Sequence, residues 1–532
     1  MKKFDYSLVK DPQYFCDGRM EAHSDHMYYR SEEEREDEET SYRHSLNGLW
    51  KFHYARNYAS TVAGFEEDAY SCKDWEDIYV PAHIQMEGYD VPQYANVQYP
   101  WEGHEELHPG QIPERFNPVG SYVKYFHVPE NMKGKRVFIS FQGAESGLAL
   151  WLNGTFVGYS EDSFTPSEFE LTEYLKEGEN KLAAQVFKWT ASSWCEDQDF
   201  FRFSGIYRDV YLYTVPEVHV YDLKIRAIPD ETLKKASLEI VTKTWGKGKL
   251  KLILSRKGEI LLQDEKALDG EDTCTWEILN PLLWSAEEPN LYDLDMEVYD
   301  ENGMLQEIIP EKVGFRRFEM KDGIMTLNGK RIVFKGVNRH EFSSVTGRHV
   351  SREELIQDIV TMKQNNINAI RTCHYPDASP IYRLCDEYGL YMIAENNLES
   401  HGSWDVAELT GDYTDIVPHN KPEWLGMMLD RVNSMYQRDK NHPAILIWSC
   451  GNESFGGKDI FEMSEFYRKN DPTRLVHYEG LFHDRSYNAT SDMESQMYPS
   501  VEAIKEFLAK DDSKPFICCE YTHAMGNSCG AM

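Results

Sequence analysis

The spacing of apolar residues divides the chain into three parts. From Leu46 to Val215, short runs alternate apolar and polar positions, and Gly, Asn and Pro separate them. The apolar residues of these runs are largely aromatic or β-branched, which is typical of strands with one buried face. This stretch predicts a β-sandwich. A second strand-rich block, from Glu217 to Glu319, predicts a smaller sandwich.

Beyond Met320 the pattern changes, because strand-like apolar runs now alternate with helical ones. This alternation is typical of βα units around a parallel sheet. The clearest helix is expected at 352–364, where Leu355, Ile359 and Met362 recur at helical spacing and Ile356 and Val360 widen the same face. Ser351 with Glu354 three residues later forms the sequence signature of a capping box. Four further helices are expected, at 380–389, 423–440, 459–469 and 501–510.

Seven strands are expected among these helices, at 331–337, 367–372, 390–395, 444–449, 475–479, 493–497 and 516–520. A (β/α)₈ barrel needs eight strands to close. We therefore expect a barrel that is truncated after strand seven, with an exposed apolar interior and unpaired edges on strands one and seven. On this count we expect the chain to be a fragment or an incomplete gene product with little or no activity.

Composition narrows the range of partners. The 532 residues carry a formal net charge of −34, which argues against nucleic acid and anionic membranes as partners because phosphate binding needs an excess of Lys and Arg. No stretch approaches the ~20 apolar residues of a membrane span, and no apolar segment follows the N-terminal lysines as in a secretory signal. The ten cysteines are sparse and irregular, so we expect reduced thiols in a cytoplasmic protein. The first forty residues are polar, with an acid-rich run at 30–41, and predict a charged, irregular surface arm.

Polar residues follow the ends of five expected barrel strands. They are "NRHE" at 338–341, "HYP" at 374–376, "ENNLESH" at 395–401, "GNES" at 451–454 and "EYTH" at 520–523. The C-terminal ends of the strands in such a barrel form one face, which carries the active site. We therefore expect these five clusters to converge on one mouth.

This mouth is rich in carboxylates and poor in basic residues, which suits acid/base chemistry on a neutral substrate such as a sugar. In glycoside hydrolysis one carboxyl group protonates the leaving oxygen, and a second attacks or activates water. Glu453 and Glu520 hold corresponding positions, just past strands four and seven. Position alone does not identify Glu453 and Glu520 as the catalytic pair, because four more acids share this face: Glu341, Glu395, Glu399 and Glu479.

From residue 45 onward the chain resembles the β-galactosidases of glycoside hydrolase family two. The motifs that carry the resemblance are "VPQYANVQYP", "EDQDFFRFSGIYRDV", "PNLYDLDMEV", "FKGVNRHEF", "IRTCHYP", "YGLYMIAENNLESHG", "NHPAILIWSCGNES" and "CEYTHAMGNS". The resemblance implies a jelly-roll β-sandwich at 45–216, an immunoglobulin-like β-sandwich at 217–319 and a catalytic (β/α)₈ TIM barrel at 320–532. Residues 1–44, which it does not cover, are expected to form an N-terminal arm.

The same resemblance implies roles for individual residues. Glu453 is implied as the general acid/base and Glu520 as the nucleophile of a retaining, double-displacement mechanism, with Tyr498 hydrogen-bonded to the nucleophile. The substrate-binding residues implied are Asn96, Asp199, His340, His374, Asn452 and His523. A Mg²⁺ site is implied at Glu399, His401 and Glu453, and Asp199 matches a Na⁺ ligand whose companion ligands are missing. In a retaining enzyme the two carboxyl groups lie ~5–5.5 Å apart.

The expected reaction is the removal of terminal non-reducing β-D-galactose from lactose-like substrates, by a protein whose full-length form is a homo-oligomer. A β-glucuronidase or β-mannosidase of the same family remains an alternative, although a glucuronidase needs basic residues for its substrate carboxylate. A non-catalytic carbohydrate-binding protein is the alternative from another class.

Some candidate residues also have purely structural interpretations. His374 fits a turn, Asp199 a solvated acidic loop and Tyr498 the end of a strand. The string "HEELH" at 104–108 matches the zinc-protease pattern, which requires both histidines on one helical face. Prolines at 100, 109 and 113 exclude a helix of useful length there, so we expect no zinc site.

Overall fold

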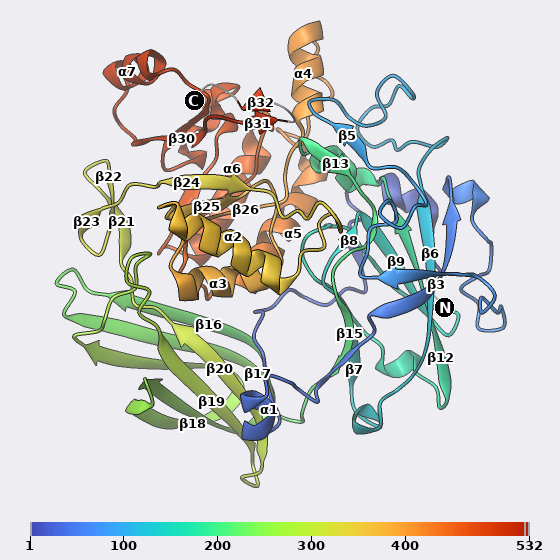
Figure 1. The fold of residues 1–532 in the computed structure, drawn as a ribbon, viewed down its shortest axis with the longest axis horizontal. Coiled ribbons are helices and arrows are strands. Elements are labelled where there is room, and N and C mark those ends of the chain that lie inside the picture. The colour runs from blue at the N-terminus through green and yellow to red at the C-terminus, as the bar shows by residue number, and fades with distance from the viewer. Residues whose placement is uncertain (1–2, 526–527, 530–532) are drawn as a thin grey trace.

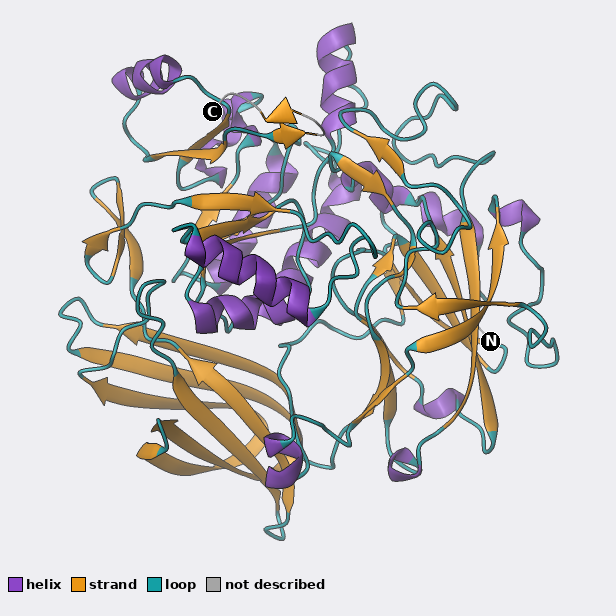
Figure 2. Cartoon of the chain, viewed as in Figure 1, coloured by secondary structure: helices purple, strands orange, loops and turns teal. Residues whose placement is uncertain are grey.

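The computed structural model describes residues 3–525 and 528–529. Figure 1 shows three bodies: a β-sandwich in blue to teal, a separate β-sheet block in green, and an α/β body in yellow to red. Helices gather almost entirely in the α/β body, whereas the other two bodies are built of strands (Figure 2). None of the described helices is long and apolar enough to cross a membrane.

Two antiparallel sheets form the N-terminal sandwich. The larger sheet contains β1 (Cys16–Asp17), β10 (Thr155–Ser160), β9 (Gly147–Leu152), β12 (Glu179–Phe187), β6 (Val119–His127), β3 (Gly48–Ala55) and β4 (Glu76–Val80), in that order. The smaller contains β11 (Ser167–Glu170), β7 (Val137–Phe141), β15 (Val210–Thr214) and β2 (Arg43–Ser45). Trp50 and Leu150 from the larger sheet share one buried cluster with Ile139 and Leu212 from the smaller. Alternating apolar residues thus fill the space between the sheets.

Two short strand pairs extend this sandwich toward the α/β body: β5 (Gln93–Ala95) with β13 (Phe200–Arg202), and β8 (Ala144–Glu145) with β14 (Gly205–Ile206).

The second β block is an antiparallel sheet of β16 (His219–Pro229), β17 (Lys235–Arg256), β18 (Glu259–Leu279), β19 (Tyr292–Asp300) and β20 (Leu305–Val313). A small sheet of β21 (Phe318–Lys321), β22 (Ile324–Leu327) and β23 (Lys330–Arg331) leads into the α/β body.

The prediction of an irregular surface arm before residue 45 is wrong in two respects. The acid run forms a short helix, α1 (Glu32–Glu36), whose N-cap Ser31 accepts a hydrogen bond from the Glu34 N–H. Glutamates in the first turn suit the positive end of a helix, which explains why this charged run is ordered. The arm also packs inward, since Val9 is fully buried.

The α/β body holds five parallel strands in sequence order: β24 (Gly336–Arg339), β25 (Ala369–Thr372), β26 (Tyr391–Glu395), β27 (Ile445–Ser449) and β28 (Leu475–His477). A parallel pair follows, β29 (Glu494–Met497) with β30 (Phe516–Glu520), and then the short pair β31 (Ala524–Met525) and β32 (Ser528–Cys529). The helices are α2 (Arg352–Gln364), α3 (Pro380–Tyr388), α4 (His401–Thr410), α5 (Pro422–Asp439), α6 (Lys458–Asn470) and α7 (Val501–Lys510).

Six of the seven expected barrel strands lie where the apolar runs predict them, and α2 has its predicted ends. The capping box at Ser351 and Glu354 is formed in both directions. Helix α4 is not among the expected helices. The first strand is misplaced, because β24 begins at Gly336 rather than at Arg331.

The misplaced strand has a physical cause. Arg331 belongs to the small hairpin, where it pairs with Thr326, and Ile332 donates its N–H to Met325 O at 3.0 Å. Ile332 and Phe334 pack on the barrel core without joining its ladder. Their alternation therefore reflects burial rather than pairing with a barrel strand.

A cavity of about 360 Å³ lies between β24 and β30. Its lining is mostly apolar and includes Val337, Ile370, Ile393 and Ile517. Asn338 Nδ2 of β24 donates to Cys519 O of β30 at 2.9 Å, and the hydroxyl of Tyr521, directly after β30, donates to Gly336 O of β24 at 3.5 Å. Within the described residues, β24 and β30 each have a ladder partner on one side only.

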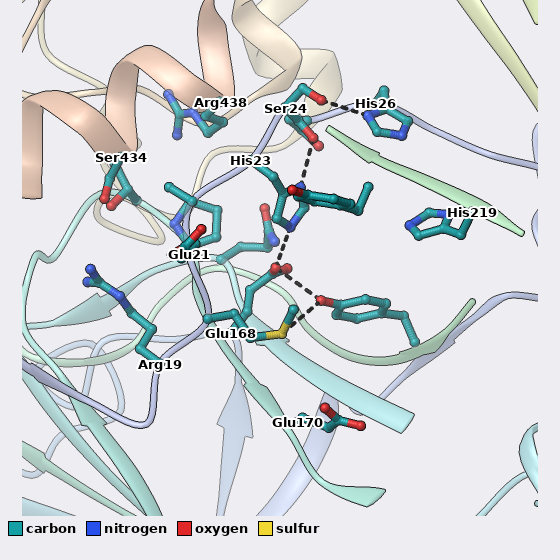
Figure 3. A pocket seen from close by; sticks show the side chains of 18 of the residues that line it. Arg19, Glu21, His23, Ser24, His26, Glu168, Glu170, His219, Ser434 and Arg438 are labelled. Carbon is teal, nitrogen blue, oxygen red and sulfur yellow. Dashed lines mark hydrogen bonds and ion pairs between the residues drawn. The ribbon is translucent and has the colours of Figure 1, made fainter. Parts of the chain in front are cut away.

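A second cavity, of about 320 Å³, lies where the N-terminal arm crosses between the two β bodies and α5 (Figure 3). His23 from the arm reaches Glu168 of β11, with Nε2 and Oε2 2.7 Å apart, and the Tyr213 hydroxyl donates to the same oxygen at 3.1 Å. Figure 3 shows this chain of contacts running through the cavity wall. None of the six acids noted at the strand ends lines this cavity, so we assign it to the junction between the bodies.

Candidate active site

A buried arginine joins the ends of several barrel strands. Arg371, at the end of β25, donates from Nε to Glu395 Oε2 at 2.6 Å, from Nη1 to Glu520 Oε1 at 2.9 Å and from Nη2 to Asn452 Oδ1 at 2.8 Å. Its Nη1 also donates to Asn338 Oδ1 at 3.2 Å. Residues far apart in the sequence thereby meet at one mouth, on the face formed by the C-terminal ends of the parallel strands.

Glu520, the predicted nucleophile, is held from several sides. Tyr498 donates its hydroxyl to Oε2 at 2.6 Å, while Oε1 accepts from Arg371 and lies 3.6 Å from His374 Nε2. Burial and the hydrogen bond to Glu520 raise the pKa of Tyr498, so its hydroxyl keeps its proton and remains a donor. Tyr498 has a φ of 50°, a strained conformation for a non-glycine residue and one that is common at functional sites. These contacts fix the orientation of the Glu520 carboxyl group.

Glu395 orients His374 toward the same carboxyl group. His374 Nδ1 lies 2.7 Å from Glu395 Oε1, and Ser449 Oγ donates to Glu395 Oε2 at 2.7 Å. Burial alone would raise the pKa of Glu395, but Arg371 and His374 lower it to about 2. Because the anchored Nδ1 fixes the ring, Nε2 is directed at Glu520.

Three potential metal ligands lie close together, next to the residues that contact Glu520. One ligand atom each from Glu399, His401 and Glu453 lies within 4.8 Å of the other two, and His401 Nδ1 is 2.7 Å from Glu453 Oε2. Asn452 connects this cluster to Arg371, since its Nδ2 donates to Glu399 Oε2 at 2.9 Å. Burial and the neighbouring Glu453 raise the pKa of Glu399 well above its usual range. Two facing carboxyl groups and an imidazole are a donor set that a hard divalent cation can bind.

The N-terminal sandwich contributes a wall to this mouth. The Asp199 N–H donates to Glu399 Oε1 at 3.3 Å, and the Asp199 carboxylate accepts from the Tyr94 hydroxyl of β5. Asn96 is exposed and follows β5 directly. The bridge between Glu196 and Glu399 joins the two bodies through their backbones. Asp199 is therefore packed against the candidate metal site and is not a freely solvated loop acid.

The predicted histidines lie together. The rings of His340 and His374 are 5.6 Å apart, and His340 stacks on Phe200 of β13 at 4.6 Å. Burial lowers the pKa of His340 well below its usual range, and His374, Arg348 and His523 lower it further, so His340 is neutral at neutral pH. His523 follows β30 and is exposed.

Arg371 is absent from the sequence prediction, whereas Asn338, Glu395 and Glu479 appear there only as polar residues at the strand ends. Arg371, which joins the strand ends of this site, gives one signal in the sequence: it is the only charged residue in the apolar run "INAIRT", and a buried charge requires a partner. Asn338 and Glu395 follow strands one and three, but nothing in the sequence marks them as Arg371 partners.

Glu479 is buried, and no described group donates a hydrogen bond to either of its carboxylate oxygens. Burial, Glu453 and Glu520 raise the pKa of Glu479 well above its usual range.

The zinc-protease pattern at 104–108 forms no helix, as expected from its prolines. His108 Nδ1 instead lies 2.5 Å from Asp415 Oδ2 on the surface.

Comparisons with known proteins agree over nearly the whole chain. Residues 43–216 match the sugar binding domain of glycosyl hydrolases family 2, residues 218–316 match a further model of glycosyl hydrolases family 2, and residues 318–532 match its TIM barrel domain. A β-galactosidase from Halalkalibacterium halodurans is 53% identical over 99% of this chain and 52% of its own length. A β-galactosidase large subunit from Leuconostoc lactis is 44% identical over 98% of this chain and 86% of its own length.

Solved structures share the fold. A β-glycosidase from Bacteroides vulgatus superposes with a TM-score of 0.71 at 25% identity, over 90% of this chain and 58% of that one. A β-glucuronidase from Ruminococcus gnavus superposes with a TM-score of 0.73 at 20% identity, over 92% of this chain and 85% of that one. This chain spans about half the length of the H. halodurans relative. The three domain matches and the large-subunit relative show that the chain belongs to glycosyl hydrolase family 2.

Proposed function

We propose that this protein is a retaining β-galactosidase that removes terminal non-reducing β-D-galactose from lactose-like substrates. The observation that carries the proposal is the Glu520 carboxyl group, oriented by Arg371 and Tyr498, on the same face as Glu453. The identity of 44–53% to the two β-galactosidase relatives supports galactose as the sugar. The likeness to glucuronidase structures at 20% identity supports the fold alone.

In the first step, Glu520 attacks the anomeric carbon and forms a glycosyl ester, while Glu453 donates its proton to the departing glycosidic oxygen. In the second step, Glu453 takes a proton from water, and the oxygen of this water displaces Glu520 from the anomeric carbon. The sum is one glycosidic bond hydrolysed by one water molecule. Arg371 and Tyr498 hold the two carboxylate oxygens in place, and the hydrogen bonds become stronger again when Glu520 regains its charge on leaving.

We further propose that Glu399, His401 and Glu453 hold Mg²⁺. Carboxylate oxygens suit a hard cation, and the ion would supply positive charge that offsets the two adjacent acids and tunes the proton affinity of Glu453. Asp199 is also proposed as a Na⁺ ligand, supported by its carboxylate at the edge of this mouth.

The metal proposal predicts that EDTA lowers activity and that added Mg²⁺ restores it. Glu399→Gln should weaken Mg²⁺ binding by more than about ten-fold, because even outer-shell partners of a metal have effects of that size. A rise in melting temperature on adding Mg²⁺ measures binding without activity, and exposed Glu353→Gln is the matched control. If Mg²⁺ stabilises both variants equally, these residues are not its ligands.

We propose that the groove between β24 and β30 is the place of the eighth barrel strand. The apolar lining of the 360 Å³ cavity supports this, as do the edges of β24 and β30 that have no ladder partner among the described residues. A homo-oligomer in the cytoplasm remains the expectation for the full protein.

The function is tested by comparing nitrophenyl galactoside, glucuronide and mannoside as substrates. We expect hydrolysis of the galactoside above all, and its loss in Glu520→Gln. A 2-deoxy-2-fluorogalactosyl fluoride should add one fluorogalactosyl mass to a peptide that contains Glu520. Preferred hydrolysis of the glucuronide or mannoside would contradict the substrate, and labelling of another residue would contradict the mechanism.

A further inference from the structure

Two histidines and a cysteine lie together beside the Glu520 carboxyl group. One ligand atom each from His340, Cys373 and His374 lies within 4.8 Å of the other two. Around a tetrahedral Zn²⁺ the same kinds of atom lie about 3.3–3.6 Å apart, because the Zn–N and Zn–S bonds are about 2.0–2.3 Å long. The three atoms therefore need to approach one another by little more than about 1 Å to hold one ion. We call these three residues the His–Cys cluster.

The two histidines have the surroundings that metal-binding histidines usually have. His374 Nδ1 lies 2.7 Å from Glu395 Oε1, and His340 Nδ1 lies 3.1 Å from the Tyr375 hydroxyl. A metal-binding histidine commonly makes such a contact with one ring nitrogen, which fixes the ring and leaves the lone pair of the other nitrogen for the metal. His374 Nε2 is 3.6 Å from Glu520 Oε1, which is beyond hydrogen-bond distance. The Nε2 atoms are thus the ones left to bind an ion.

The thiol lies at the inner end of the His–Cys cluster. Cys373 and His374 are 1% and 7% exposed, whereas His340 is only partly buried, so an ion would enter past His340. Burial raises the pKa of Cys373 and lowers that of His340, so without an ion the thiol keeps its proton and this imidazole is neutral. A buried cysteine is usually a packing residue. Here the thiol shares its place with two imidazoles, and these donors together suit zinc and other soft cations.

The charges around the His–Cys cluster suit a divalent cation. The carboxylates of Glu395 and Glu520 both border His374, and Arg371 contacts both of them. When an ion binds, a metal–sulfur bond replaces the S–H bond of Cys373, and the proton passes to solvent. The two carboxylates and the thiolate then balance the charges of Arg371 and the ion.

We propose that His340, Cys373 and His374 form a binding site for a soft divalent cation such as Zn²⁺, and that the bound ion excludes the galactoside. This site differs from the proposed Mg²⁺ site, whose two carboxylates suit a hard cation. An ion on His374 Nε2 lies next to Glu520, the residue that attacks the sugar. Exclusion of the substrate therefore rests on the proposed function, whereas binding of the ion does not.

Cadmium is the probe for the site, because a Cd²⁺–thiolate bond absorbs in the ultraviolet, whereas Cd²⁺ bound through oxygen or nitrogen alone gives no such band. The protein is treated with EDTA, dialysed and supplied with excess Mg²⁺ before Cd²⁺ is titrated. We expect one Cd²⁺ per chain to give this band in the wild type. Cys373→Ser should remove it, because a hydroxyl is a poor ligand for a soft cation.

Two further variants locate the ion. His340→Gln should weaken Cd²⁺ binding by at least about ten-fold, since losing even an outer-shell partner of a metal has an effect of that size. Cys16→Ser, which removes a partly exposed thiol from β1 of the N-terminal sandwich, is the matched control and should keep the band. Cys373→Ala replaces the serine variant if that protein does not fold.

Exclusion of the substrate is measured separately. With Mg²⁺ in excess, Zn²⁺ should raise KM for nitrophenyl galactoside and leave kcat unchanged. Cys373→Ser should need at least about ten-fold more Zn²⁺ for the same rise in KM. Galactose should raise the Cd²⁺ concentration that gives half of the full absorbance.

Each part of the proposal can fail on its own. No band in the wild type, or a band that persists in Cys373→Ser, would overturn the site. A band that depends on Cys373, with a KM that Zn²⁺ does not change, would overturn the exclusion of the substrate. If the wild-type protein hydrolyses no galactoside, the proposed function fails, and the Cd²⁺ titration still decides whether the site exists.

Discussion

At the scale of single residues, Arg371 decides the shape of the candidate active site. Its guanidinium group contacts Glu395, Glu520, Asn452 and Asn338 while it is itself buried. Only a planar, forked cation can donate to so many acceptors at once. The arginine therefore both neutralises two buried acids and fixes the orientation of the Glu520 carboxyl group.

We expect Arg371→Met to destabilise the α/β body by about 3–5 kcal/mol, because removing one member of a buried ion pair leaves an uncompensated charge. Urea unfolding followed by tryptophan fluorescence measures the change, and Arg331→Met at an exposed position is the control. Equal unfolding midpoints for the two variants would mean that Glu395 and Glu520 find other partners.

At the scale of elements, two helices end in the same way but in different surroundings. Gly389 after α3 and Gly411 after α4 both adopt left-handed conformations, with φ of 77° and 74°. A Cβ atom at Gly389 would lie 2.4 Å from Ala286 O, whereas one at Gly411 would meet nothing within 4 Å. Gly389 thus lets α3 approach the backbone of the segment that precedes the barrel.

Alanine at these two positions should have unequal effects. Gly411→Ala should cost about 1–2 kcal/mol, the penalty for a left-handed non-glycine residue. Gly389→Ala should cost more, because the clash with a backbone carbonyl adds to the same penalty. The difference between the two melting temperatures isolates the clash. If both variants have the same melting temperature, the backbone near Ala286 moves aside at little cost in free energy.

At the scale of the whole molecule, the arm and the N-terminal sandwich are joined by the pair of His23 and Glu168. Burial alone would lower the pKa of His23, but Glu168 raises it to about 9, above the value of about 6.5 for an unfolded histidine. His23 Nδ1 faces the Ser24 carbonyl at 3.0 Å and Nε2 faces the carboxylate, so both ring nitrogens act as donors. The paired form is therefore the imidazolium.

The stabilisation from this pair should be complete below pH 6.5 and should be lost as the pH rises through about 9, because the folded state then releases a proton it had kept. We expect at most about 3 kcal/mol between these limits. The melting temperature of the wild type should fall toward that of His23→Gln across this range. A constant gap between the two proteins would contradict the shifted pKa.

The sequence alone determined most of the barrel strands, α2 with its capping box, and the five polar clusters after strand ends. These features are local: hydrophobic period, capping chemistry and strand polarity are set by neighbouring residues. The resemblance also identified Glu453, Glu520 and Tyr498 as candidates, because a motif is recognised from the order of residues along the chain.

Only the tertiary structure decided which groups share contacts. It placed the Arg371 guanidinium between four partners, brought Asp199 of the sandwich against Glu399, and set Phe482 beside Trp404. It also moved the first strand to Gly336, since the packing of Ile332 mimics strand alternation. Contacts between distant residues depend on how whole bodies pack, and burial of apolar surface, which drives that packing, does not specify partners by sequence spacing.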